Sequence, residues 1–150
     1  MERIEVKDIG ILEIRILRMD HNETKTFEVL EAWKAGRELR KFVFTSIRPL
    51  LLQQREFDLA DQIKRASRSV THNIAEGHGR FHYLDNYRFC SLARGSLNEV
   101  LDQLITCDDD SLIDENLYQQ GRNHFDTTLR ILNGYMSWLQ KMAKNKSTAP

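Results

Sequence analysis

Polar side chains at helical spacing are the residues of this sequence that could do chemistry. Asn73 and Glu76 lie beside one apolar stripe, and Ser96 and Glu99 lie beside a second one further along. Two neighbouring carboxylates could act as acid and base in a reaction. No nucleophile or ligand-binding loop stands beside them, and buried polar clusters more often fix helix packing than catalyse. We therefore predict a structural network with no catalytic residue, and an enzyme using Glu76 and Glu99 is the weakest alternative.

The predicted network joins two helices across their packing seam. We expect Asn73 and Glu76 to meet Ser96 and Glu99, because an unpaired polar group on a packing face is costly. Arg80 follows Glu76 by four positions, which is the spacing of a helical ion pair. The complete predicted set is Arg65, Ser69, Asn73, Glu76, Arg80, Ser96 and Glu99.

Three histidines lie near one predicted turn, where they could form a metal site; they are His72, His78 and His82. His78 and His82 are four positions apart, and that spacing can hold zinc on one helix face. Gly77 and Gly79 interrupt the helix that would enforce the spacing, however. The paired Glu-x-x-His motifs of di-iron bundles do not occur in the sequence. We predict no metal and no cofactor, and we expect no small-molecule substrate.

Charge is balanced in total but segregated along the chain. The 22 basic and 22 acidic residues cancel. Positions 34–55 hold six basic residues and one acidic residue, whereas positions 95–121 hold seven acidic residues and no basic one. A basic face on the first two helices could bind phosphate, or it could be a solvated face that balances acidic neighbours. The net charge of zero favours a solvated face over a phosphate-binding one. The residues of the possible nucleic-acid-binding face are Lys34, Arg37, Arg40, Lys41, Lys64, Arg65 and Arg68.

Composition indicates a single cytoplasmic domain built from helices. A chain of 150 residues can bury a core without disulfides, and only two prolines and seven glycines interrupt it. No run approaches the ~18 apolar residues of a membrane span, and the start lacks the pattern of a secretory signal. Cys90 and Cys107 are expected to be reduced thiols that pack in the interior.

The hydrophobic periodicity predicts an all-α fold, an antiparallel up-down-up-down four-helix bundle. We expect helices over about 26–47, 58–79, 83–107 and 111–144, forming a bundle domain at 26–145. Residues 1–25 form an N-terminal extension whose alternating pattern suggests a strand or hairpin, and 146–150 form a disordered tail. His124 lies on the apolar stripe of the last helix, where a lone histidine is more often a core residue than a ligand.

Particular residues are expected to end or start these helices. Pro49 should end the first, because a residue before proline avoids the helical region. Asp58 should cap the start of the second, which Gly77 and Gly79 should close in the left-handed conformation. Ser111 should open the fourth, with an acidic residue three positions later.

Aromatic residues outnumber what the seam of one small bundle needs. Several should point outward, and exposed apolar patches of that size usually mark interfaces. The alternative is a thick monomer core. The residues concerned are Trp33, Phe42, Phe44, Phe81, Tyr83, Tyr87, Phe89, Tyr135 and Trp138.

Two linked motifs resemble a known bacterial family. One reads Asn-Ile-Ala-Glu-Gly-x-Gly-Arg at positions 73–80, and the other reads Ala-x-Gly-Ser-x-x-Glu at positions 93–99. With Gln62, Arg65, Ser69 and Phe89 in their expected places, the segment resembles the 23S rRNA intervening-sequence proteins (S23 family), also called four-helix-bundle proteins. The resemblance covers about residues 26–143.

The resemblance implies a bundle that assembles as a homopentamer and carries no catalytic activity. Some genes of this family lie within insertions in 23S rRNA genes. A related accessory protein of diversity-generating retroelements is a basic pentamer that binds a reverse transcriptase and nucleic acid. We therefore expect an oligomeric scaffold or adaptor whose partner is a nucleic acid or a nucleic-acid-processing protein. Direct RNA or DNA binding by the basic face is the main alternative.

Overall fold

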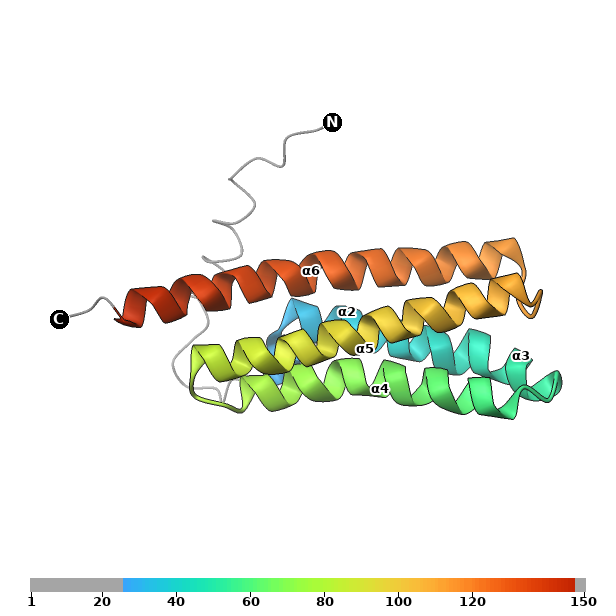
Figure 1. Cartoon of the computed structure of the whole chain (residues 1–150), viewed down its shortest axis with the longest axis horizontal. Helices are drawn as coiled ribbons and strands as arrows, with labels where there is room; N and C mark the ends of the chain where they lie inside the picture. Colours follow the sequence, from blue (N-terminus) through green and yellow to red (C-terminus); the bar gives the residue numbers. More distant parts are fainter. Residues whose placement is uncertain (1–25, 148–150) are drawn as a thin grey trace, which may run out of the picture.

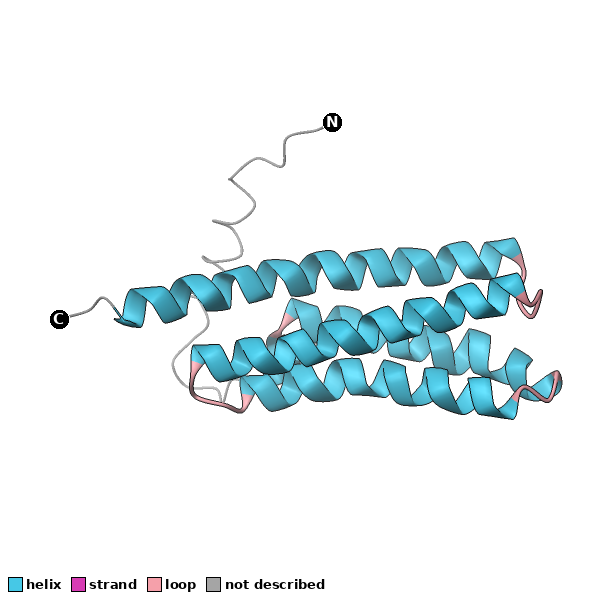
Figure 2. Ribbon diagram, viewed as in Figure 1, coloured by secondary structure: helices cyan, strands magenta, loops and turns pink. Residues whose placement is uncertain are grey.

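The computed structural model describes residues 26–147, and every regular element in that range is helical (Figures 1 and 2). The strand or hairpin predicted within residues 1–25 lies outside the described residues. The elements in chain order are η1 (Phe27–Val29), α2 (Glu31–Phe42), η2 (Val43–Ile47), α3 (Arg48–Gln53), α4 (Phe57–His78), α5 (Tyr83–Asp109) and α6 (Glu115–Ser147).

The elements form an antiparallel four-helix bundle, which confirms the predicted fold class. The segment from α2 to α3 is one rod, and α4, α5 and α6 are the other three (Figure 1). Each rod packs against two others, in the cyclic order α2, α4, α5, α6. Short turns join successive rods, so neighbours run in opposite directions.

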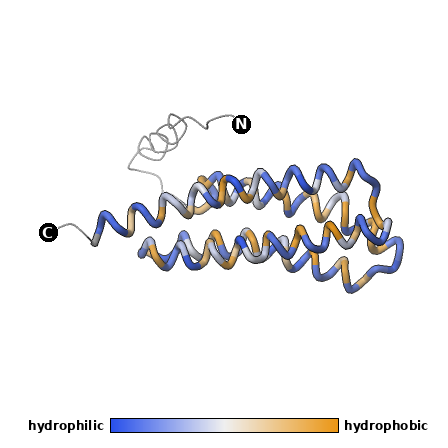
Figure 3. The backbone as a smooth tube through the Cα atoms, turned by 45° about the horizontal axis from the view of Figure 1, so that its top comes forward, coloured by the Kyte–Doolittle hydropathy of each residue, from blue (hydrophilic) through white to orange (hydrophobic). Residues whose placement is uncertain are grey.

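Buried aliphatic residues fill the interior between the four rods. Leu39, Leu97, Leu104 and Leu132 are fully buried, and each such leucine stabilises the fold by about 1.5–3 kcal/mol relative to exposure. Apolar and polar residues alternate at helical period along every rod (Figure 3). The predicted stripes of α4 and α5 are part of this core, through Ala66, Val70, Ile74, Ala93 and Val100.

The first rod continues past Pro49, so the predicted helix end at this proline is wrong. The intervening segment η2 is π-helical, and the Arg48 N–H donates to the Val43 carbonyl, five residues earlier. The wider turn resets the helix, and Pro49 lies in the first turn of α3, where its missing N–H is tolerated. The rod then ends at Arg55, which has the left-handed φ of 64°.

The ends of α4 also differ from the prediction. The N-cap is Glu56 and not Asp58, which lies inside the first turn and still favours the helix dipole there. Gly77 belongs to the helix, and Gly79 has an ordinary φ of −70°, so neither glycine takes a left-handed cap. Gly77 is required for another reason, since a Cβ there would lie 2.9 Å from the Phe89 Cβ. The glycine allows α4 and α5 to approach closely.

The start and end of α6 correct two further predictions. Asp114, and not Ser111, caps the helix, because its Oδ1 accepts from the Leu117 N–H at 2.8 Å. Ser111 instead has a φ of 56° in the turn after α5. Positions 146 and 147, which were assigned to a disordered tail, belong to α6. Lys144 and Lys146 favour this extension, because cations stabilise the C-terminal end of a helix dipole.

Candidate functional site

Two serines join α4 and α5 at the predicted polar seam. The Oγ atoms of Ser69 and Ser96 lie 2.8 Å apart in a hydrogen bond. The Asn73 Nδ2 donates to the Ser69 carbonyl at 2.9 Å and to its Oγ at 3.0 Å. All three side chains are half-buried. The structure thus brings Ser69, Asn73 and Ser96 together, in a cluster whose polar groups satisfy one another.

The charged members of the predicted network lie outside this cluster. Glu76 pairs with Arg80 at 2.7 Å on the surface, with about half of each side chain exposed. Glu99 is exposed and accepts a hydrogen bond from Gln103 at 3.4 Å on its own helix. Arg65 is exposed as well. Glu76 therefore pairs with an arginine just past the end of α4 and Glu99 with a residue of α5, so the geometry offers no shared acid–base pair.

A second polar cluster, which the sequence analysis missed, ties α5 to α6. The Asn86 Nδ2 donates to the Tyr135 hydroxyl at 2.9 Å, and the Cys90 Sγ donates to the Asn86 Oδ1 at 3.5 Å. Burial raises the pKa of both Tyr135 and Cys90 to about 12. The thiol is therefore a packing group and not a nucleophile. The signal was present in the sequence, since Asn86 occurs one turn before Cys90 on an apolar stripe.

The histidines do not form a metal centre. His72 and His82 are exposed and His78 is half-buried, and residues 26–147 contain no group of three side chains arranged to hold a metal ion. His124 lies apart from them and packs its ring on Phe42, with 4.9 Å between the ring centroids.

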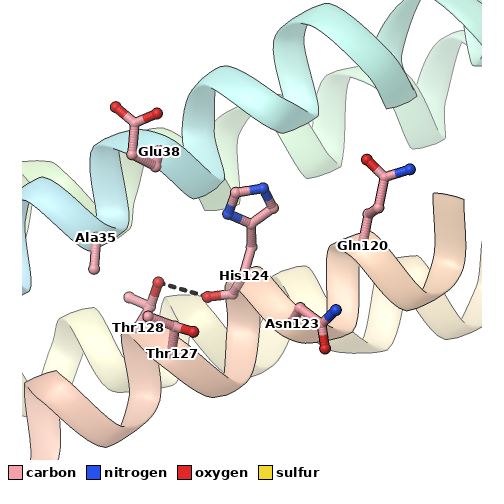
Figure 4. A pocket seen from close by; sticks show the side chains of 7 residues that line it. All are labelled: Ala35, Glu38, Gln120, Asn123, His124, Thr127 and Thr128. Atoms are coloured by element: carbon pink, nitrogen blue, oxygen red, sulfur yellow. Dashed lines mark hydrogen bonds between the residues drawn. The ribbon is translucent and has the colours of Figure 1, made fainter.

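An open groove of about 400 Å³ lies between α2 and α6 beside His124 (Figure 4). The His124 ring extends from α6 toward α2, and the Thr128 Oγ1 donates to the His124 carbonyl at 2.7 Å. Most side chains that line the groove are small or carry an amide, and one is a carboxylate. The lining residues are Ala35, Glu38, Gln120, Asn123, His124, Thr127 and Thr128. This surface groove has no activated nucleophile, so we assign it no chemistry.

We expect His124 to make the fold less stable in mild acid. Burial lowers the pKa of His124, and the Glu38 carboxylate opposes that shift more weakly. The folded state therefore favours the neutral ring, whose contribution is complete above the ordinary pKa of 6.5 and declines as the pH falls below it. A His124→Phe variant keeps the ring contact with Phe42 but cannot titrate.

Urea unfolding of the wild type and the His124→Phe variant from about pH 8 to about pH 5 measures this effect. Carboxylates titrate in both proteins, so the difference between the two pH profiles reports on His124. The wild-type free energy of unfolding is expected to decline more steeply than that of the variant. Parallel pH profiles would show that His124 titrates alike in the folded and unfolded chain.

Within residues 26–147, the predicted basic face consists of lysines that form ion pairs and arginines that form none. Lys34, Lys41 and Lys64 pair with acidic residues three positions away, at 2.9, 3.2 and 3.0 Å. Arg40 instead donates to the Thr71 Oγ1 at 2.8 Å. Arg37 lies over the Trp33 ring at 5.9 Å. The arginines are thus the cations of this face that form no ion pair with a described carboxylate.

Most of the exposed large apolar side chains lie on α5 or just before it, and only one of them is a predicted aromatic residue. Of the nine aromatic residues proposed to be in excess, Phe81 is exposed and the other eight are buried or half-buried. Trp138, for example, packs against Tyr83 and Tyr135, with ring centroids 5.7 and 5.9 Å away. The other exposed large apolar side chains are those of Leu84, Leu92 and Ile105 on α5 and Phe57 at the start of α4.

A comparison with protein families decides the affiliation of this bundle. The family model described as "23S rRNA-intervening sequence protein" matches residues 28–134, which include both seam motifs and most of all four rods. The chain belongs to the 23S rRNA-intervening sequence protein family. The family description names no reaction. The Ser69–Ser96 contact therefore lies between the two helices that carry the family resemblance.

A solved structure agrees with this family assignment at the level of the fold. A protein of unknown function from the S23 ribosomal protein family of Bacteroides thetaiotaomicron has 20% sequence identity and a TM-score of 0.66. The match covers 70% of this chain and 97% of that chain. A comparison with curated protein sequences gave no match. Within the described helices of this family member, none is long and apolar enough to cross a membrane.

Proposed function

We propose that this family member is a non-enzymatic scaffold or adaptor that works as a homo-oligomer. The observation that carries the proposal is the apolar outer surface of α5. Phe81, just before the helix, is 96% exposed, and Leu84 and Leu92 are 62% and 58% exposed. Large apolar side chains gathered on one face of a protein usually mark an interaction surface.

The spacing of these residues suits helix packing against another copy. Leu84 and Leu92 are eight residues apart, which places them on one side of α5 at a separation of about 12 Å. Gly95 continues this side, and nothing lies within 4 Å of where its Cβ would be. A second chain can approach closely at a position without a side chain. We call Phe81, Leu84, Leu92 and Gly95 the α5 face.

The partners and location follow from the same features. The family resemblance implies a pentamer, and we propose that number for the assembly. The seam carboxylates are exposed and separately engaged, which supports a role without catalysis. Cys90 and Cys107 are free and buried, as is usual in the reducing cytoplasm, where we place the protein.

We expect Leu84→Glu with Leu92→Glu to separate the assembly into monomers. Two buried carboxylates in each interface would each lack a partner, and such groups are strongly disfavoured. Sedimentation velocity of wild type and variant measures the change. Phe57→Glu is the matched control. Phe57 is also exposed, but it lies at the start of α4, whereas the α5 face begins just after the end of that helix. A variant that sediments like the wild type, or a control that dissociates equally, would contradict a role of the α5 face in assembly.

A further inference from the structure

Two arginines stack on one phenylalanine where α3 and α4 meet η2. The Arg68 guanidinium lies 4.9 Å from the Phe44 ring centroid, and the Arg48 guanidinium lies 5.9 Å from it. Phe44 belongs to the π-helical segment η2, and such segments occur often at functional sites. Stacking holds planar guanidinium groups in fixed orientations and leaves their N–H edges available.

Arg48 is the less expected of the two, because it is half-buried and forms no ion pair within residues 26–147. Its Nε atom is buried and has no hydrogen-bond partner among residues 26–147. A buried donor left unpaired costs about 1–3 kcal/mol, and more when it is charged. Such a donor calls for an explanation, and a bound anion beside the rest of the guanidinium group would offset its charge.

The surroundings of Arg48 and Arg68 are strongly cationic. Asp61 is an acidic group near Arg48, and it already accepts a hydrogen bond from Lys64 at 3.0 Å. Lys64 first, and Arg65 and Arg48 more weakly, lower the pKa of Asp61. Arg40 adds a further guanidinium along the same seam, bound to Thr71. One carboxylate therefore faces several cations.

We propose that Arg48 and Arg68, which contact the Phe44 ring, together with Arg40, four residues before Phe44 on the first rod, bind phosphate groups of a nucleic-acid backbone. We call these three arginines the arginine cluster. Guanidinium groups bind phosphate oxygens through two parallel N–H donors, which a lone ammonium cannot do. Arg40 and Arg48 are eight residues apart along the first rod, a distance of about 12 Å. That length spans several charges of one strand, which follow one another about every 3.4 Å. A small anion would bind one arginine, whereas a nucleic-acid backbone would contact all three arginines of the cluster.

The arginine cluster adds a partner to the proposed scaffold, and it does not depend on assembly. It lies on α2, α3 and α4, whereas the α5 face begins at Phe81. Variants in one surface therefore test it without touching the other. The cluster also differs from the predicted basic face, because it includes Arg48 and omits the three ion-paired lysines.

Fluorescence anisotropy with labelled probes of equal length tests the cluster. The probes are single-stranded RNA, duplex RNA and duplex DNA, titrated with the full chain at several salt concentrations. Arg48→Gln with Arg68→Gln is expected to weaken binding about tenfold or more and to reduce the salt slope by about two. Arg68→Gln alone, at an exposed position, gives an intermediate loss if the double variant does not fold. Any preference among the probes identifies the form of nucleic acid.

The matched control removes the same charge from paired lysines, in Lys34→Gln with Lys41→Gln. This control is expected to keep most of the affinity, because those ammonium groups are engaged by Glu31 and Glu38. Three results would overturn the proposal. They are wild-type protein that binds none of the probes, a control that loses as much affinity as the arginine variant, and polyglutamate that displaces the probe as well as unlabelled RNA does. The last result would indicate an acidic protein surface as the ligand.

Discussion

Replacing Gly77 with alanine is expected to lower the free energy of unfolding by about 2 kcal/mol or more. The new Cβ would lie 2.7 Å from the Asn86 Oδ1, 2.9 Å from the Phe89 Cβ and 3.1 Å from the Asn86 carbonyl oxygen. Real Cβ atoms essentially never approach other atoms within 3.0 Å. Two of the three obstacles are backbone or Cβ atoms, which cannot rotate away, so α4 and α5 would have to separate. Urea unfolding followed by circular dichroism measures the loss.

Gly134→Ala is the matched control for Gly77→Ala. Both glycines lie inside helices, Gly134 within α6 and away from the α5 face, so both substitutions gain the same intrinsic helix propensity of about 0.5–1 kcal/mol. The space around a Cβ at Gly134 is empty to 4 Å. The control is therefore expected to unfold at the same or higher urea concentration than wild type. If Gly77→Ala were equally stable, close packing of α4 on α5 would not be the reason for that glycine.

Removing the Asn86 side chain is the second large effect we expect. Asn86→Ala leaves the buried Tyr135 hydroxyl without its partner and opens a small cavity between α5 and α6. Asn86 is only 6% exposed, so water does not readily replace the lost amide. An orphaned buried polar group costs about 1–3 kcal/mol, and the cavity adds to this. We expect a total loss of about 2–3 kcal/mol, read from urea unfolding at one fixed protein concentration.

A double-mutant cycle separates the hydrogen bond from the packing. Tyr135→Phe leaves the Asn86 amide unpaired and should destabilise by about 1–2 kcal/mol on its own. The double variant should lose less than the sum of the single variants, by about 1 kcal/mol, because the second change removes a group already orphaned. Strict additivity would show that Asn86 and Tyr135 do not interact in solution as they do in the structure.

Sequence reasoning found the fold because most apolar residues obey a helical period. The stripes through Val70 and Leu97 identify which faces of α4 and α5 are buried, and both residues are indeed fully buried. It failed at Pro49, since a proline usually ends a helix and nothing in a periodicity pattern indicates that a π-turn will absorb it. The rule for proline is local, whereas the continuation of the rod is decided by tertiary packing.

The seam shows a similar division between local and tertiary information. Ser69, Asn73 and Ser96 are small polar residues on packing faces, and they meet. Glu76 and Glu99 were assigned to the same cluster, but their longer side chains reach solvent from the edge of the seam. The position of a residue along a helix sets the approximate direction of its side chain. The length of the side chain then decides whether its polar end stays in the seam or reaches solvent. The Asn86 contact with Tyr135 was missed because the two residues are far apart in the sequence, so that the polar position of Asn86 beside Cys90 does not indicate its partner. The Arg48 contact with Phe44 was missed although the two residues are four positions apart, the spacing of helical neighbours.

Native mass spectrometry of the wild-type protein tests the central claim, which is self-assembly through the α5 face, most directly. The chain has a mass of 17.6 kDa. We expect a single closed assembly whose mass is a whole multiple of that value, five being the expected number, and we expect the Leu84→Glu, Leu92→Glu variant to lose it. A wild-type protein that remains monomeric at all accessible concentrations, with Leu84 and Leu92 exposed to water, would contradict it.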